Sequence, residues 1–132
     1  MEDLVFVDWE ELLEIHRDQL QRFGGQDGFI DEGVVRSAMS RAQFAAQYAA
    51  DADLADLAAE YFFGLATTQG FMDGNKRTAL AVTSVFVRKN NWVMTITDEL
   101  MYIVAIAVAT NTLDKEGLAR VLRDHMEEIG SE

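Results

Sequence analysis

The amino-acid sequence predicts an all-α fold, a compact bundle of about six helices around a central buried helix. Apolar residues recur three and four positions apart in nearly every segment, which is the spacing of one helix face. Proline is absent from the 132 residues, and glycines separate the segments instead. Because the chain contains no internal repeat or linker, we expect residues 1–132 to form a single domain with one core.

The N-terminal third is predicted to contain two helices after a short extended lead-in over residues 1–7. Asp8 can cap the first helix, residues 9–23, and a glycine pair ends it. The second helix is expected over residues 31–42. The segment that follows, residues 41–52, is rich in alanine and glutamine, and both a continuing helix and a loop remain open for it.

The third helix, residues 53–68, has the most regular apolar pattern of the chain. The residues on its apolar face are Leu54, Leu57, Ala58, Tyr61, Phe62 and Leu65. Extending the pattern by four positions reaches Gln69, so we expect this side chain to point inward. A polar residue at that position indicates either a catalytic role or a structural hydrogen bond to the following turn.

The C-terminal half is predicted to continue with three more helices. Residues 75–89 have little polar surface, which predicts the central, most buried helix of the fold. Residues 92–96 favour a short extended segment, and residues 97–109 form an apolar helix too short to span a bilayer. A last helix begins after Asp114, which can cap it.

Two histidines occur in the chain, and neither indicates a metal site. His16 lies on the apolar face of the first helix, where a single histidine is typical of a hydrogen-bonded core residue. His125 lies near the C-terminus, and nothing in the sequence pairs it with another ligand.

The turn over residues 72–75 has the composition of a phosphate-binding helix start. A helix that opens at about Asn75 offers unpaired N–H groups and a positive dipole end to an anion. Lys76 and Arg77 add two cations in the first turn, where they are unfavourable unless an anion neutralises them. Asp73 could hold a Mg²⁺ ion that bridges phosphate oxygens. The alternative is a plain loop-to-helix junction, with Asp73 or Asn75 as the cap and both cations solvated.

The stretch from Gln69 to Leu80 resembles the signature of Fic-domain proteins, and within that family the Doc (death-on-curing) branch. The signature is His, any residue, Phe, any residue, Asp, Gly or Ala, Asn, Lys, Arg, Thr, Ala, Leu. The matching residues are Phe71, Asp73, Asn75, Lys76, Arg77, Thr78, Ala79 and Leu80. Residues 15–20, 31–33 and 37–38 also resemble Doc-type proteins, so the resemblance covers nearly the whole chain. The position of the catalytic His holds Gln69.

The resemblance implies a transferase that uses ATP and Mg²⁺. In a Fic-type enzyme the motif His takes a proton from a target hydroxyl, which then attacks a nucleotide phosphate. The resemblance assigns Asp73 to Mg²⁺ and the nucleotide phosphates to Gly74, Asn75, Lys76 and Arg77. In enzymes that transfer AMP a small Gly occupies the position of Lys76. In Doc-like proteins a Lys there accompanies transfer of the terminal phosphate, which is a kinase reaction.

Gln69 cannot act as the general base, because a primary amide takes up no proton near neutral pH. Loss of a positioned base typically lowers the rate ~10²–10⁴-fold. We therefore expect an inactive or impaired protein that keeps its fold and its nucleotide site. Three functions remain open: a Doc-like kinase, a Fic-type AMP transferase and a catalytically dead binding module. Gln69 is either a deliberate replacement that allows a toxic protein to be produced or the mark of a natural, weakened relative.

The resemblance also implies protein partners in the bacterial cytoplasm, namely a small antitoxin and a translation factor as substrate. It suggests that Phe44 to Tyr48 belong to a flap that docks the target, with a place in the core as the alternative. The net charge of −12, from 11 basic and 23 acidic residues, argues against non-specific binding to DNA or to an anionic membrane and favours a basic partner. No cationic, apolar leader segment is evident.

Residues 112–117 match the short pattern of Fic inhibitory helices, in which a Glu pairs with the motif Arg and blocks the nucleotide. Here that residue is Glu116. The same segment straddles a predicted helix start, where a Thr112 or Asp114 cap and a first-turn Glu are ordinary. We favour the capping interpretation.

Overall fold

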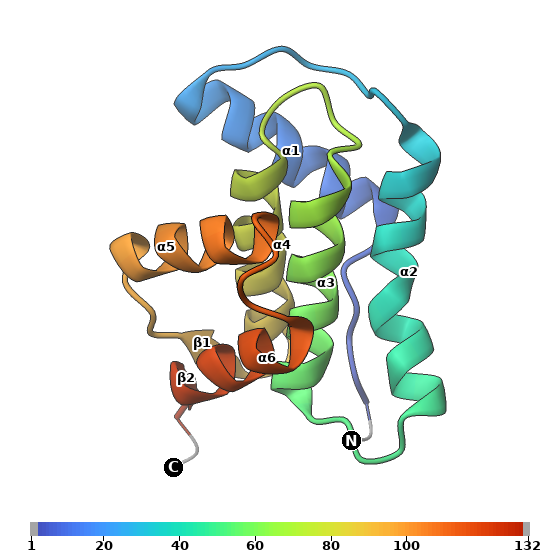
Figure 1. Cartoon of the computed structure of the whole chain (residues 1–132). Coiled ribbons are helices and arrows are strands. Elements are labelled where there is room, and N and C mark those ends of the chain that lie inside the picture. Colours follow the sequence, from blue (N-terminus) through green and yellow to red (C-terminus); the bar gives the residue numbers. More distant parts are fainter. Residues whose placement is uncertain (1–2, 131–132) are drawn as a thin grey trace.

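The computed structural model describes residues 3–130 and confirms the all-α fold (Figure 1). Its helices are α1 (Trp9–Phe23), α2 (Glu32–Tyr48), α3 (Leu54–Thr68), α4 (Asn75–Lys89), α5 (Asp98–Ala109) and α6 (Lys115–Asp124). The strands β1 (Trp92–Met94) and β2 (Met126–Glu128) pair antiparallel, with Trp92 opposite Glu128. All the buried apolar residues of the described part except Ala55 form one cluster. The prediction of a single domain also covers residues 1–2 and 131–132, which lie outside the described residues.

The most buried helix is α3, which corrects the expectation that α4 would be central. Ten of the fifteen residues of α3 are buried, against six of fifteen in α4. Figure 1 shows α3 between α2 and α4, and α5 and α6 also pack against it. Small residues allow this close packing, since a Cβ atom at Gly64 would lie 3.1 Å from that of Ala38. In the first turn of α4, Lys76 is exposed while Asn75 and Arg77 are half-buried.

The structure also settles the segments that the sequence left open. Residues 41–48 continue α2, and the expected extended segment near residues 92–96 is the strand β1. The extended N-terminal segment is anchored where the main-chain N–H of Val7 donates to the Tyr61 hydroxyl, 3.1 Å away. Burial raises the pKa of Tyr61 to about 12. None of the helices in the described part has both the length and the apolar character needed to cross a membrane.

Candidate functional site

The N-terminus of α4 differs from the other helix starts because no side chain caps it. The residues that cap the other helices through a side-chain oxygen are Asp8, Asp31, Asp53, Thr97 and Asp114. At α4 the cap position is Gly74, in the left-handed conformation with φ 81°. Neither Asp73 nor Asn75 caps this helix, which corrects that alternative. The first N–H groups of α4 are therefore available to an anion.

The Asn75 side chain is used within the motif loop. Its Oδ1 accepts from the main-chain N–H of Phe71, and its Nδ2 donates to the carbonyl of the same residue, both at 3.0 Å. This pair of bonds closes the loop between α3 and α4 into a fixed turn. The predicted contribution of Asn75 to phosphate binding is thus left to its main-chain N–H.

Asp73 is exposed, and hydrogen bonds to both its side chain and its main chain hold it in place. Its Oδ2 accepts from the main-chain N–H of Gln26 at 2.7 Å, and its carbonyl accepts from Nε2 of His16 at 2.9 Å. The described residues include no cluster of three or more His, Cys, Asp or Glu side chains that could bind a metal by themselves. One carboxylate beside a phosphate site nevertheless fits Mg²⁺, which is usually held by one or two carboxylates together with substrate phosphates.

Arg77 is anchored by the C-terminal end of α1. One guanidinium nitrogen donates to the carbonyl of Gly24 at 3.1 Å, and the other lies 3.5 Å from the carbonyl of Gln19. The guanidinium carbon also lies 5.4 Å from the ring centroid of Phe23. Carbonyls at a helix C-terminus attract a cation. The neighbouring cation, Lys76, is exposed.

Gln69 is exposed, so the expectation of an inward-pointing side chain is wrong. The helix α3 ends at Thr68, and Gln69 is its C-cap in the left-handed conformation, with φ 51° and ψ 44°. This conformation ends the helical repeat on which the expectation was based. The buried residue is instead Gly70, where a Cβ atom would lie only 2.3 Å from Cγ2 of Val35. The chain thus turns outward at the catalytic position.

The predicted residues of the motif meet in one cleft of about 430 Å³. Its lining consists of Gln69, Met72, Asp73, Gly74, Asn75, Lys76, Arg77 and Tyr102. Tyr102 comes from α5 and is 66% exposed. Sequence reasoning missed it, although a large aromatic on the outer face of an apolar helix was a usable signal. A second, more apolar groove of about 380 Å³ adjoins the cleft and shares Lys76, Arg77 and Tyr102 with it.

Phe44 and Tyr48 do not belong to this cleft. They lie in the last turns of α2, are 57% and 75% exposed, and stack on each other at 6.3 Å. The alternative of a place in the core is therefore wrong. The start of α2 adjoins the motif, since the N–H of Asp31 donates to the carbonyl of Gly70. A helix of 17 residues is roughly 25 Å long. Figure 1 accordingly shows the end of α2 far from the motif loop.

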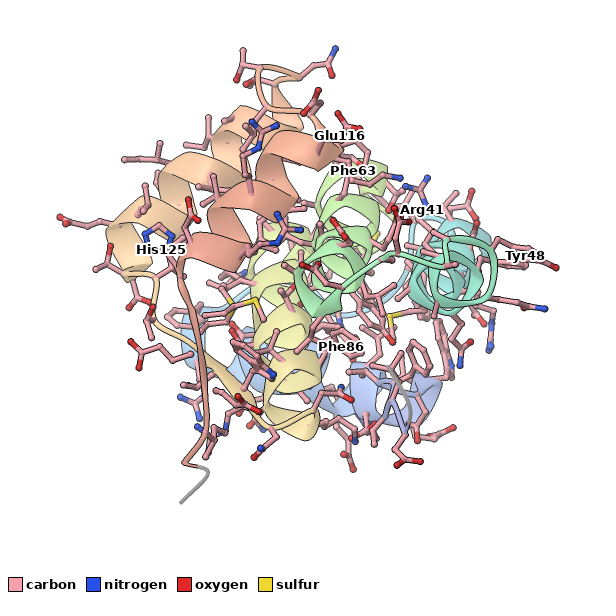
Figure 2. The ribbon with its side chains drawn as sticks, turned by 90° about the horizontal axis from the view of Figure 1, so that it is seen from below. Arg41, Tyr48, Phe63, Phe86, Glu116 and His125 are labelled. Carbon is pink, nitrogen blue, oxygen red and sulfur yellow. The ribbon has the colours of Figure 1, made fainter. Side chains whose placement is uncertain are left out.

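Figure 2 views this opposite side and shows Tyr48 projecting outward from α2, with Arg41 between α2 and α3. A shallow hollow of about 400 Å³ lies there. Its lining consists of Arg41, Phe44, Ala45, Tyr48, Glu60 and Lys115. The role of Phe44 and Tyr48 in docking a target stays a prediction, and it would hold the target at a distance from the cleft.

Glu116 is exposed in the first turn of α6, a helix that begins with a side-chain cap (Figure 2). The carboxylate of Asp114 accepts from the N–H of Gly117 at 2.8 Å. The guanidinium of Arg77 bonds the end of α1 and not Glu116. Both observations favour the capping interpretation of this segment. His125, at the other end of α6, bonds the carbonyl of Val121 through Nδ1 at 2.8 Å.

Comparison with known proteins shows which family this chain is similar to. The model of the Fic/DOC family matches residues 6–87, which span α1 to α4 and the motif loop. The chain is also 32% identical over 114 residues to "Protein kinase doc" of Escherichia phage P1. That match covers 86% of this chain and 90% of the relative.

Proposed function

Because the chain belongs to the Fic/DOC family, we propose that it is a Doc-like toxin whose cleft at the start of α4 binds Mg-ATP. The reaction served by such a site is transfer of the terminal phosphate of ATP to a hydroxyl of a translation-related protein. Gln69 leaves the protein, as written, inactive or strongly impaired. The observation that carries the proposal is the uncapped N-terminus of α4, with Asp73 just before it and Arg77 in its first turn.

Phosphate binding follows from the charges and donors of the cleft. The N–H groups at the start of α4 donate to phosphate oxygens, and the helix dipole favours the negative charge. Lys76, which is exposed, adds a second cation, and the planar guanidinium of Arg77 can present two parallel donors. Asp73 would hold Mg²⁺, which on binding neutralises and bridges phosphate oxygens. All of these groups are independent of the side chain at position 69.

The transfer itself needs a base that this chain lacks. The oxygen of the target hydroxyl would form a bond to the terminal phosphorus, and the bond between that phosphorus and the oxygen of ADP would break. The proton of the hydroxyl must leave at the same time, and a histidine at position 69 would accept it. The amide of Gln69 cannot, which lowers the rate by ~10²–10⁴-fold. The cleft therefore supports binding without efficient transfer.

Two other functions use the same cleft, and labelled ATP separates them. Lys76 and the relative described as a protein kinase favour transfer of the terminal phosphate. In the Gln69→His protein, label from γ-labelled ATP on a protein of a bacterial lysate would support the kinase. Label from α-labelled ATP alone would instead indicate AMP transfer. Partner binding without any label would identify a catalytically dead binding module.

The groove beside the cleft is the surface we assign to the antitoxin. Its lining from α1, α4 and α5 combines apolar residues with four polar or charged ones, namely Gln19, Lys76, Arg77 and Asp98. Phe23 and Tyr102 are exposed at it, 65% and 66% respectively. A small protein segment bound there would also cover Lys76 and Arg77. We place these partners in the bacterial cytoplasm, and we propose no nucleic-acid or membrane ligand. Loss of antitoxin binding in Tyr102→Asp, but not in Tyr48→Asp, would support this assignment.

Calorimetry with Mg-ATP tests the proposed site directly. The parent protein should bind with micromolar to millimolar affinity, and Arg77→Ala should bind much more weakly. Arg88→Ala is the matched control, because Arg88 is an exposed arginine at the other end of the same helix. Equal affinities for the parent and Arg77→Ala would remove the phosphate role from this helix start.

A further inference from the structure

We propose that His16 is a positioning residue of the nucleotide site, because its ring holds the main chain of Asp73 and thereby sets the place of the Asp73 carboxylate. The proposal rests on the proposed function, in which this carboxylate binds Mg²⁺. His16 belongs to α1 and lies 57 positions before Asp73 in the chain. Figure 1 shows α1 beside the loop that joins α3 to α4.

His16 makes its close contacts with the motif loop. The residue is 2% exposed, and its ring stacks on Phe71 with 3.7 Å between the ring centroids. A Cβ atom at Gly74 would lie 3.7 Å from the Cδ2 atom of His16. The Nε2 atom lies 2.9 Å from the carbonyl oxygen of Asp73. One buried ring thus contacts Phe71 and Asp73, and a side chain at position 74 would also meet it.

The direction of the hydrogen bond follows from the acceptor. A carbonyl oxygen can only accept, so Nε2 carries the proton and donates it to Asp73. Nδ1 is 3.9 Å from the carboxylate of Asp27, which is beyond hydrogen-bond distance. Since burial of a polar ring is unfavourable unless it is hydrogen-bonded, packing alone would favour an apolar residue at position 16. The hydrogen bond to Asp73 therefore explains why a histidine, and not an apolar residue, occupies position 16.

Other hydrogen bonds hold the rest of the loop, and none of them involves the main chain of Asp73. Asn75 binds both main-chain groups of Phe71, and the N–H of Met72 donates to the carbonyl of Gly28 at 2.9 Å. Among the described residues, the carbonyl of Asp73 accepts a hydrogen bond from His16 alone. The next residue is Gly74, whose main chain is intrinsically flexible. Without His16 the Asp73 carbonyl loses this hydrogen bond, and Asp73 is then held only through its carboxylate, which accepts from the N–H of Gln26 at 2.7 Å.

A matched set of variants separates the hydrogen bond from the packing of the ring. His16→Phe keeps an aromatic ring against Phe71 and removes the donor. His16→Gln keeps an N–H donor at a similar reach and removes the stack. His125→Phe is the control, because His125 also bonds a main-chain carbonyl, at 2.8 Å, but within α6. None of these positions lines the motif cleft.

Two readouts test the proposal, one without any ligand. Amide hydrogen exchange of residues 72–75, measured by NMR, should be about fivefold faster in His16→Phe than in the parent, because one hydrogen bond is lost. The affinity for ATP should fall about tenfold in the presence of Mg²⁺ and stay unchanged in EDTA, as is typical when a group that orients a metal ligand is removed. His16→Gln and His125→Phe should resemble the parent in both readouts.

Several outcomes would overturn the proposal. Parent-like exchange and parent-like Mg-ATP affinity in His16→Phe would show that the bond positions nothing. Damage in His16→Gln but not in His16→Phe would assign the effect to the stack. Equal losses with and without Mg²⁺ would indicate a merely structural role. Failure of the parent to bind Mg-ATP would refute the proposed function and the metal role of His16 together, whereas slow, His16-dependent exchange would still show that His16 holds the loop.

Discussion

If the proposed function is right, replacement of Gln69 by histidine should raise the rate of phosphate transfer about 10²–10⁴-fold. The structure favours this change because the Gln69 side chain is exposed at the cleft and has no hydrogen bond to the described residues. Its main chain has a positive φ of 51°, a conformation in which histidine is several-fold enriched among non-glycine residues. We expect the free energy of unfolding to change by no more than about 0.5 kcal/mol.

The assay is single-turnover transfer from γ-labelled ATP to proteins of a bacterial lysate. The rate of Gln69→His should rise with pH and level off above about pH 7, because an imidazole with an ordinary pKa of ~6.5 must be neutral to accept a proton. Gln69→Asn is the matched control, since asparagine tolerates the same main-chain conformation and adds no base. The reasoning is refuted if Gln69→His is no faster than Gln69→Asn although both bind Mg-ATP.

Three further predictions concern stability, measured by urea unfolding. Gly70→Ala should lower the free energy of unfolding by about 1–3 kcal/mol, because its methyl group would lie 2.3 Å from a valine of α2, while Gly130→Ala, with open space around it, should not. Tyr61→Phe should cost about 1–3 kcal/mol by leaving a buried main-chain N–H unpaired. Between pH 10 and about 12, Tyr61 ionises in the unfolded parent but stays protonated in the folded parent, so the free energy of unfolding of the parent falls as the pH rises. Tyr61→Phe should not show this fall. The Arg123 guanidinium lowers the pKa of Asp53 to about 2, so the stability difference between the parent and Arg123→Ala should shrink as the pH falls from 3.8 to about 2.

The sequence by itself determined where most of the helices lie, and it suggested the chemistry of the motif. Helix starts follow from residues such as Asp8 and Asp114, whose side chains accept from the main-chain N–H three positions later, and both of these hydrogen bonds are present. The helical spacing of apolar residues predicted α3, and the motif residues predicted where α4 begins. These features depend on neighbours within one or two helical turns, so local reasoning is sufficient for them.

Tertiary structure decided how the site is held and which way its residues face. The left-handed conformation of Gln69 ends the helical repeat, and periodicity carries no information beyond that point. The partners of Asp73 and Arg77 come from α1 and the segment after it, 47 to 58 positions away in the chain. The apolar pattern showed that His16 would be buried, but the carbonyl it bonds depends on how two helices pack. Contacts between distant segments arise only when the core assembles, because they depend on the shapes and distances of packed side chains.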